Sequence, residues 1–345
     1  MRAVLTSEQE MLRDTAVGLA GAMSVNTPGD LLRVDRSKGW SALAGAGLLA
    51  MRGRDADGAP LGSGFDTALV AQALGGALAP APFVGALLAY ELLALAGAPE
   101  DWLTDIGGGA VRYGLLMARD LDALADLEKL EGAVCVDAEG AEYVLALAGG
   151  GADLRVVRLR LSDEGAPRGV DLTRPFRAWS TATAEQDVAG ALSTADLDRW
   201  TALALSLVCA DLVGVLRAGL AQVVEYSKTR IQYGVPIGSF QAVQHMCADM
   251  LVQTEAAASA TNYAAWAVDA LEPTESLMAA RTAKAYCGPI GQNVGETLMQ
   301  AYGGIGQTWE HVAHLRTRRA MTDRKLFGDE SVQLLHIADA RLGQG

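Results

Sequence analysis

The sequence predicts a mostly α-helical α+β fold made of three consecutive parts. Half of the 345 residues are apolar but only 6% are aromatic, so the apolar content is mostly Ala, Leu and Val, as in closely packed helices. Apolar residues recur at helical spacing near both ends of the chain, and short β-branched runs separated by Gly and Asp occupy its middle. We therefore expect an N-terminal helical domain at residues 1–104, a small β-domain at 105–192 and a C-terminal four-helix bundle at 193–345.

The N-terminal part reads as a series of short helices. Ser7 followed by Glu10 predicts a capping box, and apolar residues then recur at helical spacing as far as Met23. Further helical stretches are expected at residues 40–49, 67–78 and 86–95. The second of these ends at a Gly-Gly pair and a Pro-Ala-Pro breaker.

Three short runs predict the strands of the β-domain, at residues 133–136, 143–147 and 154–161. In the last run, Val156, Leu159 and Leu161 alternate with arginines, with one slip in the pattern. Such alternation is typical of a strand with one buried face.

The C-terminal part contains four long helical stretches, at residues 200–228, 241–271, 273–302 and 310–342. The first would be about 43 Å long and is apolar nearly all round, so it should be buried on most sides. Pro273 stands where the first turn of a helix tolerates it. Short connections between these helices predict an antiparallel bundle.

The charge pattern excludes several partners. The net charge is −13, so the chain lacks the basic footprint of a nucleic-acid-binding protein. Residues 1–199 hold 28 acidic and 17 basic residues, whereas residues 200–345 hold 13 and 11. No signal-peptide core and no uninterrupted apolar run of about 18 residues occurs, so we expect a cytoplasmic protein that does not enter a membrane.

The sequence offers no metal site. The four cysteines are widely spaced, as expected for buried free thiols in a reducing compartment. His311 and His314 lie three residues apart, but no third ligand is in view. The one basic run comprises Arg316, Arg318, Arg319, Arg324 and Lys325. A solvated or interface face is the favoured interpretation of this run, and an anion contact is the alternative.

The most informative stretch is RIQYGVPIGSFQAVQHMCADM at residues 230–250. It begins with a loop between two predicted helices that exposes backbone N–H groups and one guanidinium, which suits a diphosphate. The whole string closely resembles the signature of the acyl-CoA dehydrogenase family. A second element resembling that family, QAYGGIGQTWE, lies at residues 300–310. Weaker similarities near residues 5–9, 74–83 and 171–174 extend the resemblance to the whole chain.

The resemblance implies a three-part fold, FAD bound between subunits, and α,β-dehydrogenation of an acyl-CoA thioester with an electron-transfer flavoprotein as acceptor. It also implies seven cofactor-binding residues. Arg230, Gln232 and Tyr233 would approach the flavin nucleotide, and Gln241 would lie near its diphosphate and adenosine. Gln300, Gly303 and Gly304 would reach the cofactor of a neighbouring subunit.

The chain departs from the family at the catalytic base, which must be a positioned Glu or Asp. The two positions at which the family places it are occupied here by Ala204 and Phe327, so the catalytic residue is unknown. Asp211 and Asp329 are the nearest carboxylates. Each could substitute for the base, but a capping or surface role is the favoured interpretation for both. The Thr-Glu-Pro-x-x-Gly-Ser-Asp stretch that contacts flavin in the family is also missing. The segment where it should lie, residues 112–120, reads RYGLLMARD.

Retained cofactor motifs beside a missing base resemble the degenerate subunit of a heterotetrameric acyl-CoA dehydrogenase that acts on steroid side chains. In that interpretation a homologous partner subunit supplies the base and the acyl-CoA pocket. Two alternatives stay open. One is a self-sufficient homotetrameric dehydrogenase with a relocated base such as Asp329. The other is a flavin-free scaffold or non-redox protein of the same fold.

Overall fold

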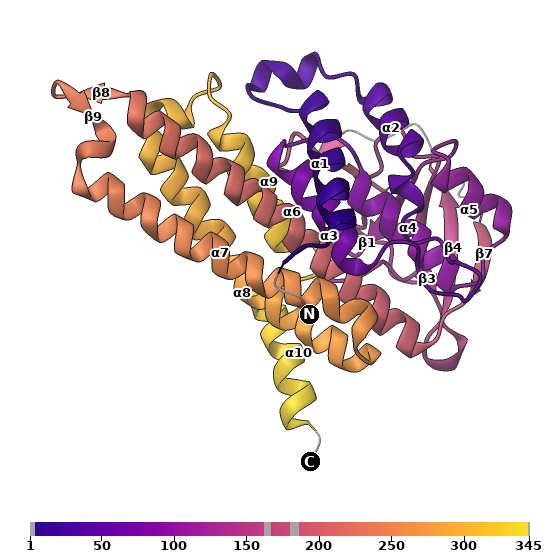
Figure 1. The fold of residues 1–345 in the computed structure, drawn as a ribbon. Coiled ribbons are helices and arrows are strands. Elements are labelled where there is room, and N and C mark those ends of the chain that lie inside the picture. Colours follow the sequence, from indigo (N-terminus) through magenta and orange to yellow (C-terminus); the bar gives the residue numbers. More distant parts are fainter. Residues whose placement is uncertain (1–3, 162–166, 180–185, 344–345) are drawn as a thin grey trace.

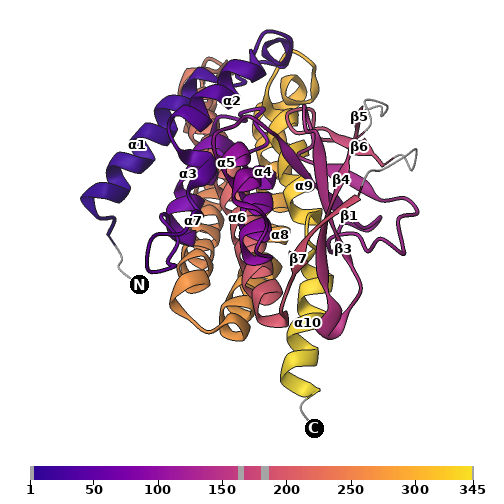
Figure 2. The same ribbon diagram turned by 90° about the vertical axis from the view of Figure 1, so that its right-hand side faces the viewer.

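The computed structural model describes residues 4–161, 167–179 and 186–343. Helices precede and follow a central group of strands along the chain (Figure 1). In Figure 2 the first helices lie on one side of the molecule and the sheet on the other, with α4 and α6 between them. The prediction of a mostly α-helical α+β fold is therefore confirmed.

The N-terminal helices are α1 (Ser7–Ala22), η1 (Pro28–Leu32), α2 (Arg36–Gly45), η2 (Leu48–Ala50), α3 (Gly64–Gly76), α4 (Phe83–Leu95) and α5 (Glu100–Gly107). The capping box of α1 lies one residue earlier than predicted. Thr6 has an extended backbone and accepts a hydrogen bond from the N–H of Gln9, whose side chain accepts from the N–H of Thr6. A box starting at Ser7 is therefore wrong, because Ser7 already belongs to the helix.

The main sheet has the order β5-β6-β2-β1-β3-β4-β7. Its strands are β1 (Tyr113–Met117), β2 (Val134–Val136), β3 (Tyr143–Ala148), β4 (Arg155–Arg160), β5 (Pro167–Arg168), β6 (Phe176–Ala178) and β7 (Gln186–Ala191). A short 3₁₀ helix, η3 (Gly151–Asp153), precedes β4. The pairing of β4 with β7 shifts register between Val156 and Val157. This β-bulge is the physical basis of the slip in the alternation of β4, because one extra residue moves the pattern to the other face.

The central strand β1 was not predicted. It pairs antiparallel with β2 and parallel with β3, and all five of its residues are buried. Leu115 and Met117 join the main core, whereas Leu116 points into a second apolar cluster on the other face of the sheet. A strand buried on both faces shows no alternation of apolar and polar residues, so periodicity does not reveal it.

The C-terminal helices are α6 (Thr194–Thr229), α7 (Gln241–Ala270), α8 (Pro273–Tyr302), α9 (Ala313–Lys325) and α10 (Glu330–Leu342). Between α6 and α7 lie β8 (Ile231–Gln232), β9 (Val235–Pro236) and η4 (Ile237–Ser239), and η5 (Gly303–Gln307) follows α8. The expectation of one helix over residues 310–342 is wrong. Phe327 and Gly328 have positive φ angles of 60° and 83°, and Asp329 then N-caps α10. Left-handed backbone cannot continue an α-helix, so the chain turns there.

Helix α6 is the central element of the fold. By length and composition it could cross a membrane, but 83% of its most apolar window is buried inside the protein, as in the core helix of a globular protein. It packs against α3, α4, α7, α8 and α9. Its crossing with α3 is close: a Cβ added to Gly214 would lie 2.0 Å from the carbonyl oxygen of Gln72, and one added to Gly75 would lie 2.3 Å from that of Asp211. Glycine at both positions is required by this backbone contact.

Candidate functional site

The first motif forms the turn between α6 and α7. Arg230 ends α6, and the chain then makes a two-stranded hairpin whose turn residues are Tyr233 and Gly234. Both turn residues have positive φ angles, 53° and 81°, which is the geometry of a two-residue type I′ turn. The turn holds the Tyr233 ring in solvent, with 94% of the residue exposed. Gln241 is the first residue of α7, so its side chain lies beside the free N–H groups of a helix N-terminus.

The second motif ends α8. Gln300 lies in its last turn, and Gly303 leaves the helix with a φ of 64°. A Cβ added to Gly303 or Gly304 would find no atom within 4 Å. The space over these two glycines is therefore open, and a ligand can approach their backbone closely.

The structure brings both motifs to the same end of the bundle (Figure 1). Tyr226, in the last turn of α6, and Tyr302, at the end of α8, have ring centroids 4.9 Å apart. All seven predicted cofactor-binding residues are exposed there. Within the described part of the chain, the Arg230 guanidinium has no hydrogen-bond or ion-pair partner, so it is free to bind an anion.

This donor set fits a dinucleotide diphosphate. A free guanidinium, an amide beside a helix N-terminus and uncrowded glycine backbone are groups that bind phosphate oxygens. They form an open surface on one chain, and a second surface must cover a cofactor that lies on it. Arg230, Gln232, Tyr233 and Gln241 thus remain candidate ligands, together with Gln300, Gly303 and Gly304.

The two positions expected for a catalytic base lie in the core. Ala204 is fully buried in the first third of α6, and Phe327 is 5% exposed. The Phe327 ring packs edge-on against Trp200, with ring centroids 5.8 Å apart. Neither position can offer a carboxylate to a substrate.

The backbone around Phe327 is tied to the segment that follows β1. The N–H of Phe327 donates to the carbonyl of Leu121 at 2.8 Å, and its own carbonyl accepts from the Gln333 side chain at 2.6 Å. Leu121 lies just beyond the residues that stand in place of the family's flavin-contacting stretch. Direct contact between these two loops therefore closes the space between the sheet and the bundle at this point.

Asp211, the first alternative carboxylate, is committed to a buried ion pair. Its two oxygens accept from Nε and Nη2 of Arg319 at 2.7 and 2.6 Å, and Nη1 of Arg174 lies 3.6 Å away. Burial alone would raise the pKa of Asp211, but the charge and hydrogen bonds of Arg319 outweigh it and hold that pKa below its ordinary value. A buried carboxylate whose pKa is held down by such an ion pair is a poor proton acceptor.

Asp329, the second alternative, has the capping role that is commoner for such a residue. Its side chain accepts from the N–H groups of Ser331 and Val332 and pairs with Lys325. The hydrogen bond from Lys325 is the main reason that the pKa of Asp329 is lowered. The self-sufficient enzyme with Asp329 as base therefore gains no support from its geometry.

The pair of Asp211 and Arg319 belongs to a larger buried network that sequence reasoning missed. Arg174 binds Asp137 through two hydrogen bonds of 2.8 and 2.9 Å and reaches Asp323 at 3.3 Å. Burial, followed by the neighbouring charge of Asp211, raises the pKa of Asp323 well above its ordinary value. The network thus places the three buried carboxylates of Asp137, Asp211 and Asp323 against the two guanidinium groups of Arg174 and Arg319.

The expectation of a solvated face for the basic run of α9 is wrong for two of its arginines. Arg316 and Arg319 are 3% and 1% exposed, so a fully solvated face is wrong for them. Their spacing of three residues, followed by Asp323 four residues later, places all three on one face of α9. The signal available in the sequence was an acidic residue, Asp323, four positions after Arg319 in the same predicted helix.

The described residues contain no group of three or more His, Cys, Asp or Glu side chains that could hold a metal ion. The His311 ring packs on Tyr302 and the His314 ring stacks on Trp309. All four cysteines are free, and Cys247 is the one that is not fully buried.

Known proteins are similar to this chain both over its C-terminal part and over nearly its full length. Residues 205–342 match the model of the acyl-CoA dehydrogenase C-terminal domain. The chain is 29% identical over 329 residues to acyl-CoA dehydrogenase IpdE2 of Mycobacterium tuberculosis, and the match covers 91% of each protein. A shorter match of 118 residues, 43% identical, covers 34% of this chain and only 17% of acyl-CoA dehydrogenase FadE34 of the same organism.

Among solved structures, the steroid acyl-CoA dehydrogenase pair Tcur3481–Tcur3483 superposes with a TM-score of 0.79 at 24% identity. The superposition covers 97% of this chain and 98% of that one. This likeness shows the fold. Together with the full-length match to IpdE2 and the C-terminal domain match, it makes the chain similar to acyl-CoA dehydrogenases over nearly its whole length.

Proposed function

We propose that the chain is a subunit of an FAD-dependent acyl-CoA dehydrogenase that helps to complete a flavin site between subunits and supplies no catalytic base. The contrast between two sets of residues carries this proposal. The seven motif residues are exposed at one end of the bundle, whereas Ala204 and Phe327 are buried in the core.

The chain's own residues have binding roles in this proposal. When bound, FAD would accept the hydride that leaves Cβ of the acyl group. Arg230 would hold a phosphate oxygen through charge-assisted hydrogen bonds, and Gln241 would add an amide at the N-terminus of α7. Gln232 and Tyr233 would approach the flavin nucleotide, while Gln300, Gly303 and Gly304 would reach the cofactor of a neighbouring subunit.

The partner would be a homologous subunit that carries a Glu or Asp base and the acyl-CoA pocket, in a heterotetramer. The close contact of Phe327 with Leu121 and Trp200 supports this division, because the corresponding space in this chain is filled. Similarity to a steroid acyl-CoA dehydrogenase pair favours a steroid side-chain acyl-CoA as substrate. The complex would act in the cytoplasm and pass its electrons to an electron-transfer flavoprotein.

The test is to purify the chain alone and together with the product of its neighbouring gene. We expect the isolated chain to be colourless and inactive, and the complex to be yellow and to reduce a dye with acyl-CoA. An isolated chain that holds FAD and reduces the dye would contradict the missing base. A colourless, inactive complex would instead favour a flavin-free protein.

A matched pair of variants tests the residue roles in that complex. Arg230→Met removes charge-assisted hydrogen bonds to phosphate, so FAD affinity should fall about tenfold or more. Arg155→Met, at an exposed arginine on the sheet that pairs with Asp153, is the control and should leave FAD affinity unchanged. Equal FAD affinity in the two variants would exclude Arg230 as a ligand.

A further inference from the structure

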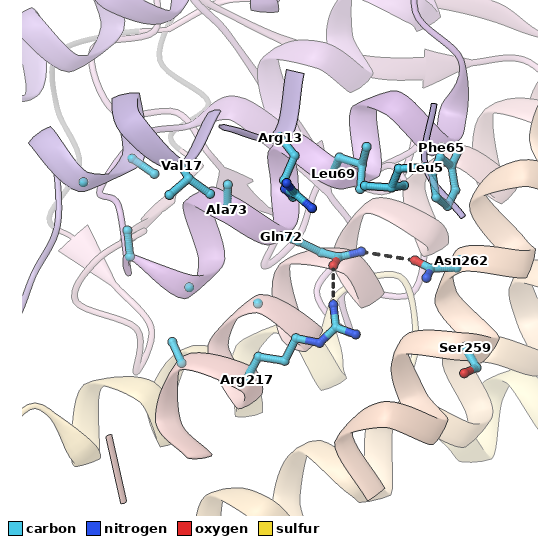
Figure 3. A pocket seen from close by; sticks show the side chains of 16 residues that line it. Leu5, Arg13, Val17, Phe65, Leu69, Gln72, Ala73, Arg217, Ser259 and Asn262 are labelled. Atoms are coloured by element: carbon cyan, nitrogen blue, oxygen red, sulfur yellow. Dashed lines mark hydrogen bonds between the residues drawn. The ribbon is translucent and has the colours of Figure 1, made fainter. Parts of the chain in front are cut away.

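A cleft with a volume of about 740 Å³ lies between α1, α3, α6 and α7 (Figure 3). This volume falls in the range of about 300–1,000 Å³ that is typical of small-molecule pockets. Its walls are mainly apolar and include Val17, Phe65, Leu69 and Ala73. Val17 is 55% exposed, so an apolar side chain faces the open side of the cleft.

Three polar side chains from three different helices converge in this cleft. Nη1 of Arg217 donates to the side-chain oxygen of Gln72 at 3.1 Å, and Nε2 of Gln72 donates to the side-chain oxygen of Asn262 at 3.3 Å (Figure 3). Arg217 is itself fixed by a two-pronged pair with Glu255, with distances of 2.9 and 2.8 Å. The three side chains thus form a hydrogen-bonded row, and the pair with Glu255 fixes the position of Arg217 at its charged end.

The direction of this row follows from chemistry. Arginine can only donate hydrogen bonds, so Gln72 must turn its oxygen toward Arg217 and its NH₂ group toward Asn262. Asn262 must then turn its oxygen toward Gln72, which leaves its own NH₂ group uncommitted among the described residues. The row therefore presents N–H donors to an incoming ligand.

The charged groups around the cleft also favour a ligand that accepts hydrogen bonds. Arg13 extends its guanidinium toward the same space, and no carboxylate is among the lining residues (Figure 3). The carboxylates that balance the two arginines, Asp14 and Glu255, lie outside the lining. Ser259, the remaining polar residue, already donates its hydroxyl hydrogen to the backbone oxygen of Glu255.

The inner wall of the cleft is rigid. It includes Gly76 and Gly214, at the crossing where the backbones of α3 and α6 are in contact. A wall fixed by backbone contact needs little rearrangement when a ligand binds.

We propose that this cleft binds a small molecule with an apolar body and a terminal oxygen acceptor, a carbonyl or a carboxylate. The apolar body lies along Val17, Phe65 and Leu69, and the oxygen accepts from Asn262 and Gln72. The site is separate from the cofactor surface, because Arg217 lies 13 residues before Arg230, about 20 Å along α6. It therefore does not depend on the proposed function.

The test is calorimetric titration of the purified chain with three ten-carbon probes below their micellar concentrations: decanoate, 2-decanone and decylammonium. Decanoate and 2-decanone should bind with one-to-one stoichiometry. Decylammonium should not bind, because its head group offers only donors to a lining of donors. Absence of binding for both oxygen-containing probes, or equal binding of decylammonium, would overturn the proposal.

Three variants locate the binding. Asn262→Leu removes the uncommitted donors, so the affinity for 2-decanone should fall about fivefold to tenfold. Asn293→Leu makes the same change at an exposed position of α8 outside the cleft and should leave the affinity unchanged. Ala73→Phe fills the cleft and should abolish binding, with the helical circular dichroism spectrum preserved. Unchanged binding by Asn262→Leu or by Ala73→Phe would place the probe elsewhere and refute the assignment.

Discussion

Removal of Arg319 should break the electrostatic connection between the three parts of the chain. Its Nε and Nη2 bind Asp211 on α6, and its Nη1 donates to the carbonyl of Ala79 and to the hydroxyl of Thr173, each at 3.0 Å. These partners belong to the bundle, to the connection between α3 and α4, and to the segment before β6. One guanidinium thus joins three regions that are far apart in the sequence.

The size of the effect follows from burial. The side chains of Arg319 and Asp211 are 1% and 0% exposed, so Arg319→Met leaves a carboxylate that is buried from water and whose nearest remaining cation is Arg174, 3.6 Å away. Loss of one partner from a buried ion pair costs about 3–5 kcal/mol, because the remaining charge is uncompensated. We therefore expect Arg319→Met to lower the free energy of unfolding by at least about 3 kcal/mol.

A double-mutant cycle separates charge from packing. Asp211→Asn preserves the shape of the side chain and removes its charge, so the combination with Arg319→Met leaves no unmatched carboxylate. The double variant should be more stable than the sum of the single changes predicts, with a coupling energy of about 1–3 kcal/mol. Urea unfolding followed by tryptophan fluorescence measures all four proteins.

Two results would refute this reasoning. One is a loss under about 1 kcal/mol for Arg319→Met, which would mean that the pair is effectively solvated. The other is strict additivity in the cycle, which would show that the two side chains do not interact. Hydrogen exchange supplies a second readout, because faster exchange in the sheet of Arg319→Met would show that the sheet had lost its tie to the bundle.

Three further outcomes are expected. Gly214→Ala places a methyl group 2.0 Å from the Gln72 oxygen and should cost about 1–3 kcal/mol of stability, whereas Gly18→Ala, with open space on α1, should gain up to about 1 kcal/mol in the same urea assay. Because the folded-state pKa of Asp323 is raised, its stabilising contribution is present below the ordinary Asp pKa and is lost as pH rises through the folded value. The stability of the native chain relative to Asp323→Asn should therefore fall as the pH rises above about 4, and a difference that stays constant with pH would contradict the shift. Phe327→Glu restores a carboxylate at a family base position but buries it against Trp200, so it should lower stability by about 3 kcal/mol or more and create no dehydrogenase activity in the isolated chain; dye reduction by this variant would show that the site is open.

The long helices were predictable from the sequence because each carries its own signal. Helix α8 runs over Pro273–Tyr302 as predicted, since Pro marks its first turn and a glycine with a positive φ ends it. The break at Phe327 was missed because a left-handed Phe is rare, although the following Gly-Asp pair is a common sign of one helix ending and another beginning.

The site was only partly predictable. The two cofactor motifs could be located because their residues are local in sequence and carry a family pattern. The network around Asp211 and Arg319 joins residues more than 100 positions apart, and burial alone distinguishes Arg316 and Arg319 from the half-buried Arg318 in the same helix. A single sequence without a structure gives no measure of that burial.

The exposed end of the bundle has a consequence for production of the protein. An unassembled copy presents Tyr233 at 94%, Trp309 at 60% and Ile305 at 42% exposure, together with part of Phe240, on one small surface. Apolar patches of this kind on a free chain promote aggregation and recognition by chaperones and proteases. In the proposed heterotetramer, cells that make this chain in excess of its partner subunit would lose the surplus, so matched synthesis of the two would set how much complex accumulates.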